Sequence, residues 1–258
     1  MIDIGVNINH SFFLNDLSVV LSEMKETGVT GMICIASDLE ESQTIHALSQ
    51  QHLGLWHTVG CHPHQAKTWT NDSKALCEAL IQAQRPVAMG ETGLDFNRNY
   101  STPNEQRAAF HAQIELATQC QLPLYLHERD AHQEMIATLK QHPDLAQKSV
   151  IHCFTGSRAE LDEYLALGLC IGITGWVCDE RRGAELQAAI PHIPLDRLLL
   201  ETDAPYLLPR TIRPRPKKNH PKYLPYVAEE VARLKNIDMR ALIEATRANT
   251  ARVFQIPL

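Results

Sequence analysis

Eight short apolar segments recur along this 258-residue chain and alternate with longer amphipathic segments. Their near-continuous runs of aliphatic and β-branched residues are typical of strands buried on both faces, as in parallel sheets. A repeated strand–helix order indicates a parallel α/β fold, and eight repeats predict a (β/α)8 TIM barrel. The predicted strands are Ile2–Ile8, Gly31–Ser37, Leu55–Gly60, Pro86–Gly93, Leu122–His127, Ser149–Phe154, Leu169–Thr174 and Leu198–Thr202.

The segments between the predicted strands carry apolar residues at helical spacing, as at Leu17, Leu21 and Met24. A helical tail, predicted from Pro221 to about Phe254, follows the eighth strand. Linkers and shifts of composition do not interrupt the pattern, and one barrel accounts for a chain of about 250 residues. We therefore predict a single domain over residues 1–258.

The composition is that of an ordinary globular protein, with 44% hydrophobic and 21% charged residues, which argues against disorder. The seven cysteines are odd in number and form no CxxC pair, so a disulfide framework and a thiolate zinc site are both disfavoured. The N-terminal segment lacks the features of a signal peptide. The longest uncharged stretch, Tyr164–Cys178, is too short to cross a bilayer. We expect a cytoplasmic protein that does not associate with membranes.

Reactive side chains gather at the C-terminal ends of the predicted strands. In a (β/α)8 barrel these ends meet at one face, where the active site is built. Residues far apart in sequence are therefore predicted to converge. The residues concerned are Asn7 and Asn9 near the end of the first strand, His62 and His64 after the third, Glu91 and Asp95 at the fourth, His127 in the fifth, His152 in the sixth, and Glu201 and Asp203 at the end of the eighth.

Imidazoles and carboxylates that converge on one point are the ligands of a metal site. Glu91, His127 and His152 form the strongest trio, and Asp203 is placed to be a further ligand or to position water. A single buried histidine is more often a hydrogen-bonded core residue. Burial of three ionisable groups without a partner is costly, however, which favours the metal. The donor set alone favours Zn²⁺ or Mn²⁺ over Mg²⁺.

The His-Pro-His sequence at residues 62–64 holds two imidazoles in a restricted geometry, because proline limits its own backbone and that of the preceding residue. His62 is a candidate phosphate contact or leaving-group acid, and His64 is a candidate substrate contact. A rigid surface turn is the alternative. We expect solvated or structural roles for His10, His46, His52, His111, His132, His142 and His192.

Positive charge is concentrated in one segment of a chain whose net charge is −6. Six basic residues lie between Arg210 and Lys222, where several prolines disfavour a helix. The segment follows the eighth strand, so it is expected to border the site and to bind a polyanion through Arg210, Arg213 and Arg215. A solvated loop is the alternative. Beside a metal site, binding of a phosphoester is favoured.

Together these motifs resemble the TatD family of metal-dependent deoxyribonucleases, and most closely the subfamily that gives the family its name. The similarity extends over nearly the whole chain. It implies an amidohydrolase-type TIM barrel with a divalent metal, Mg²⁺ before Mn²⁺ or Zn²⁺, that degrades single-stranded DNA from the 3′ end, with RNA as a second substrate. The matching motifs are GCHPH, GETGLDFNRN, HERDAH, HCFTG, GITGWVCDERRG and ETDAPYLLPR.

The resemblance also implies roles for individual residues. Glu91, His127 and His152 match metal ligands of the family, and Asp203 matches an aspartate that acts as ligand or base. His62 matches a histidine that contacts phosphate. Glu201 belongs to the same motif as Asp203, and we assign it to the catalytic group.

The first strand departs from the family pattern. Many relatives carry Asp-x-His-x-His there, with the two histidines holding a second metal ion, whereas this chain has Gly5 and Asn7 at the histidine positions. Glycine offers no ligand and an amide oxygen is a weak one. The resemblance therefore leaves open whether one or two ions bind.

We hypothesise that water activated by the metal ion hydrolyses phosphodiester bonds, in a protein that we expect to be a monomer. A small-molecule amidohydrolase or phosphoesterase on the same barrel is the alternative, because this fold supports many reactions. A non-enzymatic metal-binding scaffold is a third hypothesis, and a full set of ligands at the strand ends disfavours it.

Overall fold

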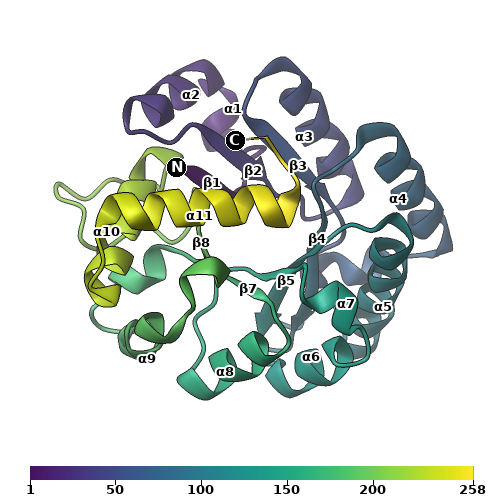
Figure 1. Ribbon diagram of the computed structural model, residues 1–258. Coiled ribbons are helices and arrows are strands. Elements are labelled where there is room, and N and C mark those ends of the chain that lie inside the picture. Colours follow the sequence, from purple (N-terminus) through teal and green to yellow (C-terminus); the bar gives the residue numbers. More distant parts are fainter. Residues whose placement is uncertain (258) are drawn as a thin grey trace.

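The computed structural model describes residues 1–257, and it confirms the predicted barrel (Figure 1). The eight strands are parallel and follow one another around the barrel in sequence order. A bridge between Val6 and Ala204 joins the first strand to the segment after the last. The strands are β1 (Ile2–Val6), β2 (Gly31–Cys34), β3 (Leu55–Val59), β4 (Ala88–Asp95), β5 (Leu124–Arg129), β6 (Val150–Ile151), β7 (Cys170–Ile173) and β8 (Leu198–Leu200).

Helices surround the strands and bury their apolar faces against them, as the amphipathic segments predict (Figure 1). The α-helices are α1 (Ser11–Leu14), α2 (Leu17–Glu26), α3 (Leu39–Gln51), α4 (Asn71–Gln84), α5 (Pro103–Cys120), α6 (His132–Leu139), α7 (Pro143–Ala146), α8 (Arg158–Ala166), α9 (Ala184–Ala189), α10 (Leu224–Lys235) and α11 (Met239–Phe254). Short 3-10 helices are η1 (Pro63–Thr68), η2 (Gly175–Cys178), η3 (Ile190–His192), η4 (Leu195–Arg197) and η5 (Pro221–Tyr223).

The predicted C-terminal helical tail is divided into η5, α10 and α11. The division between α10 and α11 falls at Asn236, which adopts a left-handed conformation with φ of 53° and ends α10. Asp238 then caps α11 by accepting hydrogen bonds from the first backbone N–H groups of the helix. The tail is therefore helical as predicted, but it turns between two helices.

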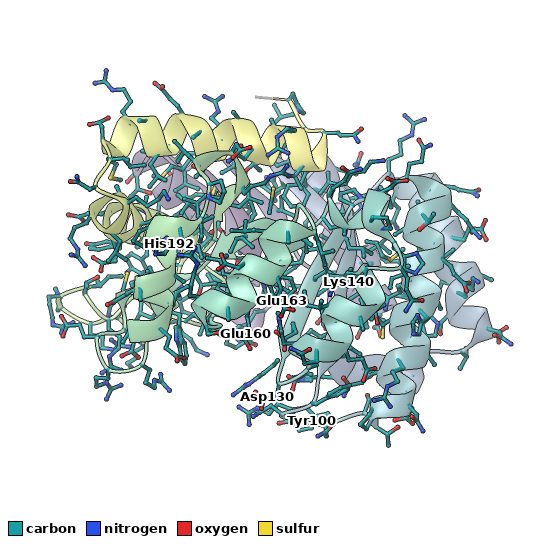
Figure 2. The ribbon with its side chains drawn as sticks, turned by 60° about the horizontal axis from the view of Figure 1, so that its bottom comes forward. Tyr100, Asp130, Lys140, Glu160, Glu163 and His192 are labelled. Carbon is teal, nitrogen blue, oxygen red and sulfur yellow. The ribbon has the colours of Figure 1, made fainter. Side chains whose placement is uncertain are left out.

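The last helix, α11, crosses one end of the barrel (Figure 1). Val253, Phe254 and Ile256 pack into a buried cluster with Ile4, Tyr125 and other residues from inside the barrel. Figure 2 shows α11 at one end of the molecule, with Tyr100 and Asp130 from the loops after β4 and β5 at the other. Because α11 closes the N-terminal end, the opposite face is left for the strand ends that carry the reactive residues.

Every strand has bounds that differ by a few residues from the predicted ones, and two of these differences bear on the site. β4 continues to Asp95, because Leu94 and Asp95 still pair with β5. β6 ends at Ile151 instead of Phe154, because Cys153 leaves the extended conformation with φ of 47°. The backbone N–H of Cys153 donates to the side chain of Glu201, so β6 ends where its backbone turns toward the site.

Within residues 1–257, every helix falls short of the length or hydrophobicity that a membrane crossing requires.

Candidate active site

A pocket of about 740 Å³ opens at the C-terminal face of the barrel. It brings together six of the residues to which the sequence analysis gave a role in the site, and they come from five different strand ends. This convergence follows from the barrel, in which all strands end on the same face. The pocket is lined by Asn7, Asn9, His10, Ser37, Glu41, His62, His64, Gln65, Glu91, Asp95, Arg98, His127, Glu128, Arg129, His152, Cys153, Thr155, Trp176, Asp203, Tyr206 and Leu207.

One oxygen of Glu91 is the centre of the site. Glu91 Oε1 lies 2.8 Å from His152 Nε2 and 3.0 Å from His127 Nδ1. The third imidazole is that of His62, whose Nε2 lies 3.3 Å from the same oxygen. Glu91 is buried, so three imidazoles from three strand ends face one carboxylate away from bulk water.

This donor set fits a divalent cation. Ligand atoms of His62, Glu91 and His127 all lie within 4.8 Å of one another, which is close enough for one ion to contact them together. His152 adds a fourth donor beside Glu91. The predicted trio Glu91, His127 and His152 is thus brought together, and His62, which the motif predicted as a phosphate contact, is also placed among the candidate ligands.

The charges of the cluster stabilise one another. Burial alone raises the pKa of Glu91, but the nearby imidazoles of His152 and His62 outweigh this and hold that pKa well below its ordinary value. Burial lowers the pKa of His152, but the carboxylates of Glu91 and Glu201 raise it well above its ordinary value. For His62 burial dominates and lowers its pKa to about 4, so this imidazole is neutral near pH 7.

Asp203 lines the same pocket from the segment after β8. Its φ of 56° turns the chain, and its carboxylate accepts a hydrogen bond of 3.0 Å from the amide of Asn7. Burial raises the pKa of Asp203 to about 7, and the charges of Glu91 and Glu201 add to this against the opposing effect of His152. A carboxylate with such a pKa exchanges protons near neutral pH.

His64 is held in place by Asp95, a residue that the sequence analysis placed among the strand-end residues but to which it gave no role. Asp95 Oδ2 lies 2.6 Å from His64 Nε2 and 3.4 Å from His127 Nε2. Asp95 is buried and also accepts hydrogen bonds from the backbone N–H groups of Asn97 and Arg98. The available signal was its place, four residues after Glu91 at the end of the same strand.

Glu201 lies behind His152 and outside the set of residues that line the pocket. It is fully buried, and its Oε2 lies 3.4 Å from His152 Nδ1. A second-layer carboxylate of this kind orients a ligating imidazole. The sequence analysis assigned Glu201 to the catalytic group, and its location suits it to act through His152.

The predicted basic residues lie beyond the pocket lining. Arg210 Nε is 3.8 Å from Asp179 Oδ1, and Arg213 donates hydrogen bonds to the backbone carbonyls of Arg210 and Ile212. Arg215 is exposed. Lys222, at the far end of the segment, pairs with Glu23 on α2 at 2.7 Å.

Two other arginines, Arg98 and Arg129, do line the pocket. Both are exposed, and they follow Asp95 and His127 by three and two residues. They therefore bring positive charge nearer to the candidate metal ligands than the predicted basic segment does. Their positions close to strand ends could have identified them as pocket residues, but the sequence analysis did not use this signal.

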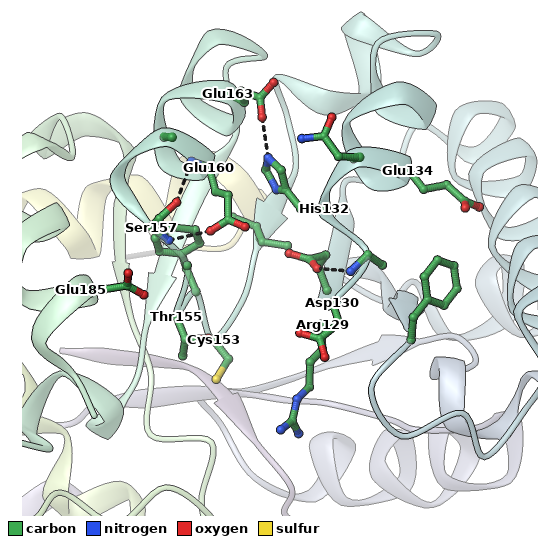
Figure 3. A pocket seen from close by; sticks show the side chains of 18 of the residues that line it. Arg129, Asp130, His132, Glu134, Cys153, Thr155, Ser157, Glu160, Glu163 and Glu185 are labelled. Atoms are coloured by element: carbon green, nitrogen blue, oxygen red, sulfur yellow. Dashed lines mark hydrogen bonds and ion pairs between the residues drawn. The ribbon is translucent and has the colours of Figure 1, made fainter. Parts of the chain in front are cut away.

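An acidic pocket, also of about 740 Å³, adjoins the first (Figure 3). The two pockets share Glu128, Arg129, His152, Cys153 and Thr155. Several of its acids have local partners. Glu163 lies 2.7 Å from His132 Nε2, and Glu160 accepts the backbone N–H of Ser157 in the capping box of α8 (Figure 3). His132 is thus buried and paired, in line with its predicted structural role.

Comparisons with known proteins give matches that extend over nearly the whole chain. A family model described as TatD related DNase matches residues 2–255. The 3′-5′ ssDNA/RNA exonuclease TatD of Edwardsiella piscicida is 48% identical over 99% of this chain and 100% of its own length. The protein of the same name from Cronobacter sakazakii is 49% identical over 98% of this chain and 97% of its own.

Solved structures show the same architecture. The crystal structure of YJJV, a TatD homolog from Escherichia coli K12, superimposes with a TM-score of 0.92 at 28% identity. The match covers 100% of this chain and 98% of that one. An uncharacterized amidohydrolase from Saccharomyces cerevisiae, at 22% identity and a TM-score of 0.88, shares the fold.

Proposed function

The chain belongs to the family of TatD-related DNases, and on this premise we propose that it is a metal-dependent 3′-5′ exonuclease on single-stranded DNA and RNA. The observation that carries the proposal is the convergence of three imidazole nitrogens on Glu91 Oε1, at the face where barrel enzymes build their active sites. The names of the relatives from Edwardsiella piscicida and Cronobacter sakazakii support the substrate class and the polarity.

Glu91, His127, His152 and Asp203 would hold the metal ion, with His62 as a neighbouring imidazole. When bound, a divalent ion supplies Lewis-acid polarisation of a phosphoryl oxygen and lowers the pKa of water. A mixed set of imidazoles and carboxylates suits Zn²⁺ or Mn²⁺, whereas the family resemblance favours Mg²⁺, and we propose Mg²⁺. The buried carboxylate of Glu91 explains how three imidazoles are kept together before any ion binds.

Asp203 is the proposed proton acceptor for the attacking water. It lies at the pocket wall, where water has access, and in the protein without metal its burial raises its pKa to about 7. His62, neutral at this pH, donates an N–H to a phosphate oxygen. His64, fixed by Asp95, is the proposed second contact to the substrate.

The remaining predicted residues act at a greater distance. Glu201 is proposed to orient His152 from behind. Arg98 and Arg129 are proposed to bind phosphates in the pocket, and Arg210, Arg213 and Arg215 to bind phosphates farther along the strand. We propose that residues 1–258 act as one domain and as a monomer, because the ligand cluster is assembled entirely from this chain.

Digestion of end-labelled nucleic acid tests the function. Purified protein is incubated with 5′-labelled single-stranded DNA, duplex DNA and RNA, each with Mg²⁺, Mn²⁺, Zn²⁺ or EDTA. The proposal predicts stepwise shortening of single strands from the 3′ end with Mg²⁺ and none with EDTA. A 3′-phosphate-blocked strand is the matched control and should be degraded more slowly.

Two outcomes would count against the proposal. Absence of strand shortening with every metal would reject the nuclease and favour a small-molecule amidohydrolase or phosphoesterase on this barrel. Shortening that persists in EDTA would reject the role of the metal centre.

A further inference from the structure

Glu201 is a fully buried carboxylate with close neighbours on β1, β5, β7 and the segment after β6. Its Oε1 accepts the backbone N–H of Cys153 at 2.5 Å, and its Oε2 accepts the hydroxyl of Tyr125 at 2.7 Å. The same Oε2 faces His152 Nδ1 at 3.4 Å. A buried carboxylate is costly unless its oxygens are hydrogen-bonded, so these two donors determine where Glu201 can sit.

Tyr125 reaches Glu201 from inside the barrel. The residue is fully buried on β5, and its ring lies in the apolar cluster that α11 closes. The centroid of this ring lies 6.4 Å from that of the Phe254 ring. Its ring also packs on that of His152, with centroids 4.9 Å apart and planes inclined by 31°. Tyr125 therefore contacts His152 directly through its ring and indirectly through Glu201.

Two glycines leave the space in which this contact forms. A β-carbon on Gly5 of β1 would lie 2.5 Å from both Glu201 Oε2 and the Tyr125 hydroxyl oxygen. A β-carbon on Gly172 of β7 would lie 2.6 Å from Glu201 Oε1. The Tyr125–Glu201 pair thus fills the volume that any side chain at position 5 would need.

We propose that the Tyr125 hydroxyl is a positioning group of the metal centre. By donating to Glu201 it holds this carboxylate against His152, and it thereby keeps His152 Nε2 directed toward Glu91 and the metal position. Gly5 is required at its position because the pair occupies the space in front of it. The inference rests on the proposed metal centre, but it concerns a tyrosine that lies outside the pocket lining and outside the predicted site.

The test compares metal binding in two matched tyrosine variants. Tyr125→Phe keeps the ring and removes the hydroxyl. Tyr164→Phe is the control, because Tyr164 on α8 is equally buried and also donates to a carboxylate, that of Glu128, at 3.1 Å. Mn²⁺ binding is measured by isothermal titration calorimetry without nucleic acid, and thermal melting is measured for each protein.

Loss of an outer-layer partner typically weakens metal binding 10–100-fold. Tyr125 acts through Glu201, so we expect the lower end, about tenfold weaker Mn²⁺ binding in Tyr125→Phe. Tyr164→Phe should bind Mn²⁺ as the natural protein does. In strand-shortening assays Tyr125→Phe should lower kcat and leave KM unchanged, because its hydroxyl contacts no part of the pocket.

A second variant tests the same contact from β1. Gly5→Ala should weaken Mn²⁺ binding in the natural background and have little further effect in Tyr125→Phe, because both changes act on the Glu201 carboxylate. Equal Mn²⁺ affinity in Tyr125→Phe and the natural protein would overturn the positioning role and leave the nuclease proposal intact. If the natural protein shows no nuclease activity but Tyr125→Phe still binds Mn²⁺ more weakly than it does, the positioning role is supported and the nuclease proposal is rejected.

Discussion

The carboxylate of Glu91 lies 2.8 Å from Nε2 of His152, although 61 residues separate them in the sequence. The contact exists because β4 and β6 end on the same face of the barrel. Glu91 Oε1 also faces His127 and His62, so this oxygen connects β4 with the ends of β3, β5 and β6. Removing its charge should therefore affect the whole cluster.

Glu91→Gln is expected to reduce strand shortening by more than about 100-fold, beyond the range typical of outer-layer changes. The amide keeps the volume of the side chain but lacks the charge that binds the cation. The rate of shortening of 5′-labelled single-stranded DNA in Mg²⁺ is the measurement. Glu115→Gln, at an exposed ion pair with Lys74, is the control and should keep full activity. Undiminished hydrolysis by folded Glu91→Gln would contradict the proposed centre.

Asp95→Asn should lower activity about 10–100-fold, because Asp95 orients both His64 and His127. Both imidazoles face Oδ2, whereas Oδ1 accepts backbone N–H groups, so an amide, which has one oxygen, can accept from only one of these two sets of donors. The measurement is kcat and KM on single-stranded DNA, together with Mn²⁺ affinity. Asp162→Asn on the exposed side of α8 is the matched control. An Asp95→Asn protein with unchanged kcat and metal affinity would show that this pair has no role in positioning.

Arg129→Ala and Arg215→Ala separate the two groups of basic residues. If both contact phosphates, each change should weaken binding of single-stranded DNA and reduce the slope of log affinity against log salt by about 0.7. Fluorescence anisotropy with the Glu91→Gln protein measures binding without cleavage. Arg233→Ala, on α10 and paired with Glu230, should leave the slope unchanged. An unchanged slope in Arg215→Ala would remove the predicted basic segment from the path of the substrate.

Asp3 should make stability depend on pH. It is fully buried beneath the site, where it accepts hydrogen bonds from the backbone and hydroxyl of Thr202. Burial raises the pKa of Asp3 to about 8, above the value of about 3.9 expected when unfolded. The folded state therefore binds the proton more tightly, and this stabilisation is complete below pH ~4 and is lost as pH rises through about 8.

Asp3→Asn is predicted to flatten the decline of melting temperature between pH 5 and 8, because the amide stays neutral and can keep the contacts with Thr202. Thermal melting followed by circular dichroism at a series of pH values measures this decline in melting temperature. Asp72→Asn, at an exposed position in α4, should follow the profile of the natural protein. If the melting temperature of Asp3→Asn declines as steeply with pH as that of the natural protein, a group other than Asp3 causes the decline.

The barrel and the convergence of the site were predictable, because in a parallel barrel the position of a residue at a strand end determines the face on which it lies. Glu91, His127, His152 and Asp203 were predicted in this way to converge, and they line one pocket. The family motifs pointed to the same residues. The strand–helix repeat alone was also sufficient to predict the order of the strands around the barrel.

Side-chain contacts within that face were less predictable. The position of Asp95 depends on the extension of β4 beyond Gly93, and that of Glu201 on the left-handed turn at Cys153. Both depend on local backbone conformation, which the pattern of hydrophobic residues in the sequence does not predict. The basic segment shows the same limit, since its prolines disfavoured a helix but did not reveal that Arg213 donates to backbone carbonyls.

The most direct measurement is the location of a bound metal ion. A crystal of the protein soaked in Mn²⁺ is examined by anomalous diffraction at a wavelength where manganese scatters strongly. The account predicts an anomalous peak bounded by Glu91, His127, His152 and Asp203, and its loss in Glu91→Gln. A map without a peak among these side chains, or a peak that persists unchanged in Glu91→Gln, would contradict it.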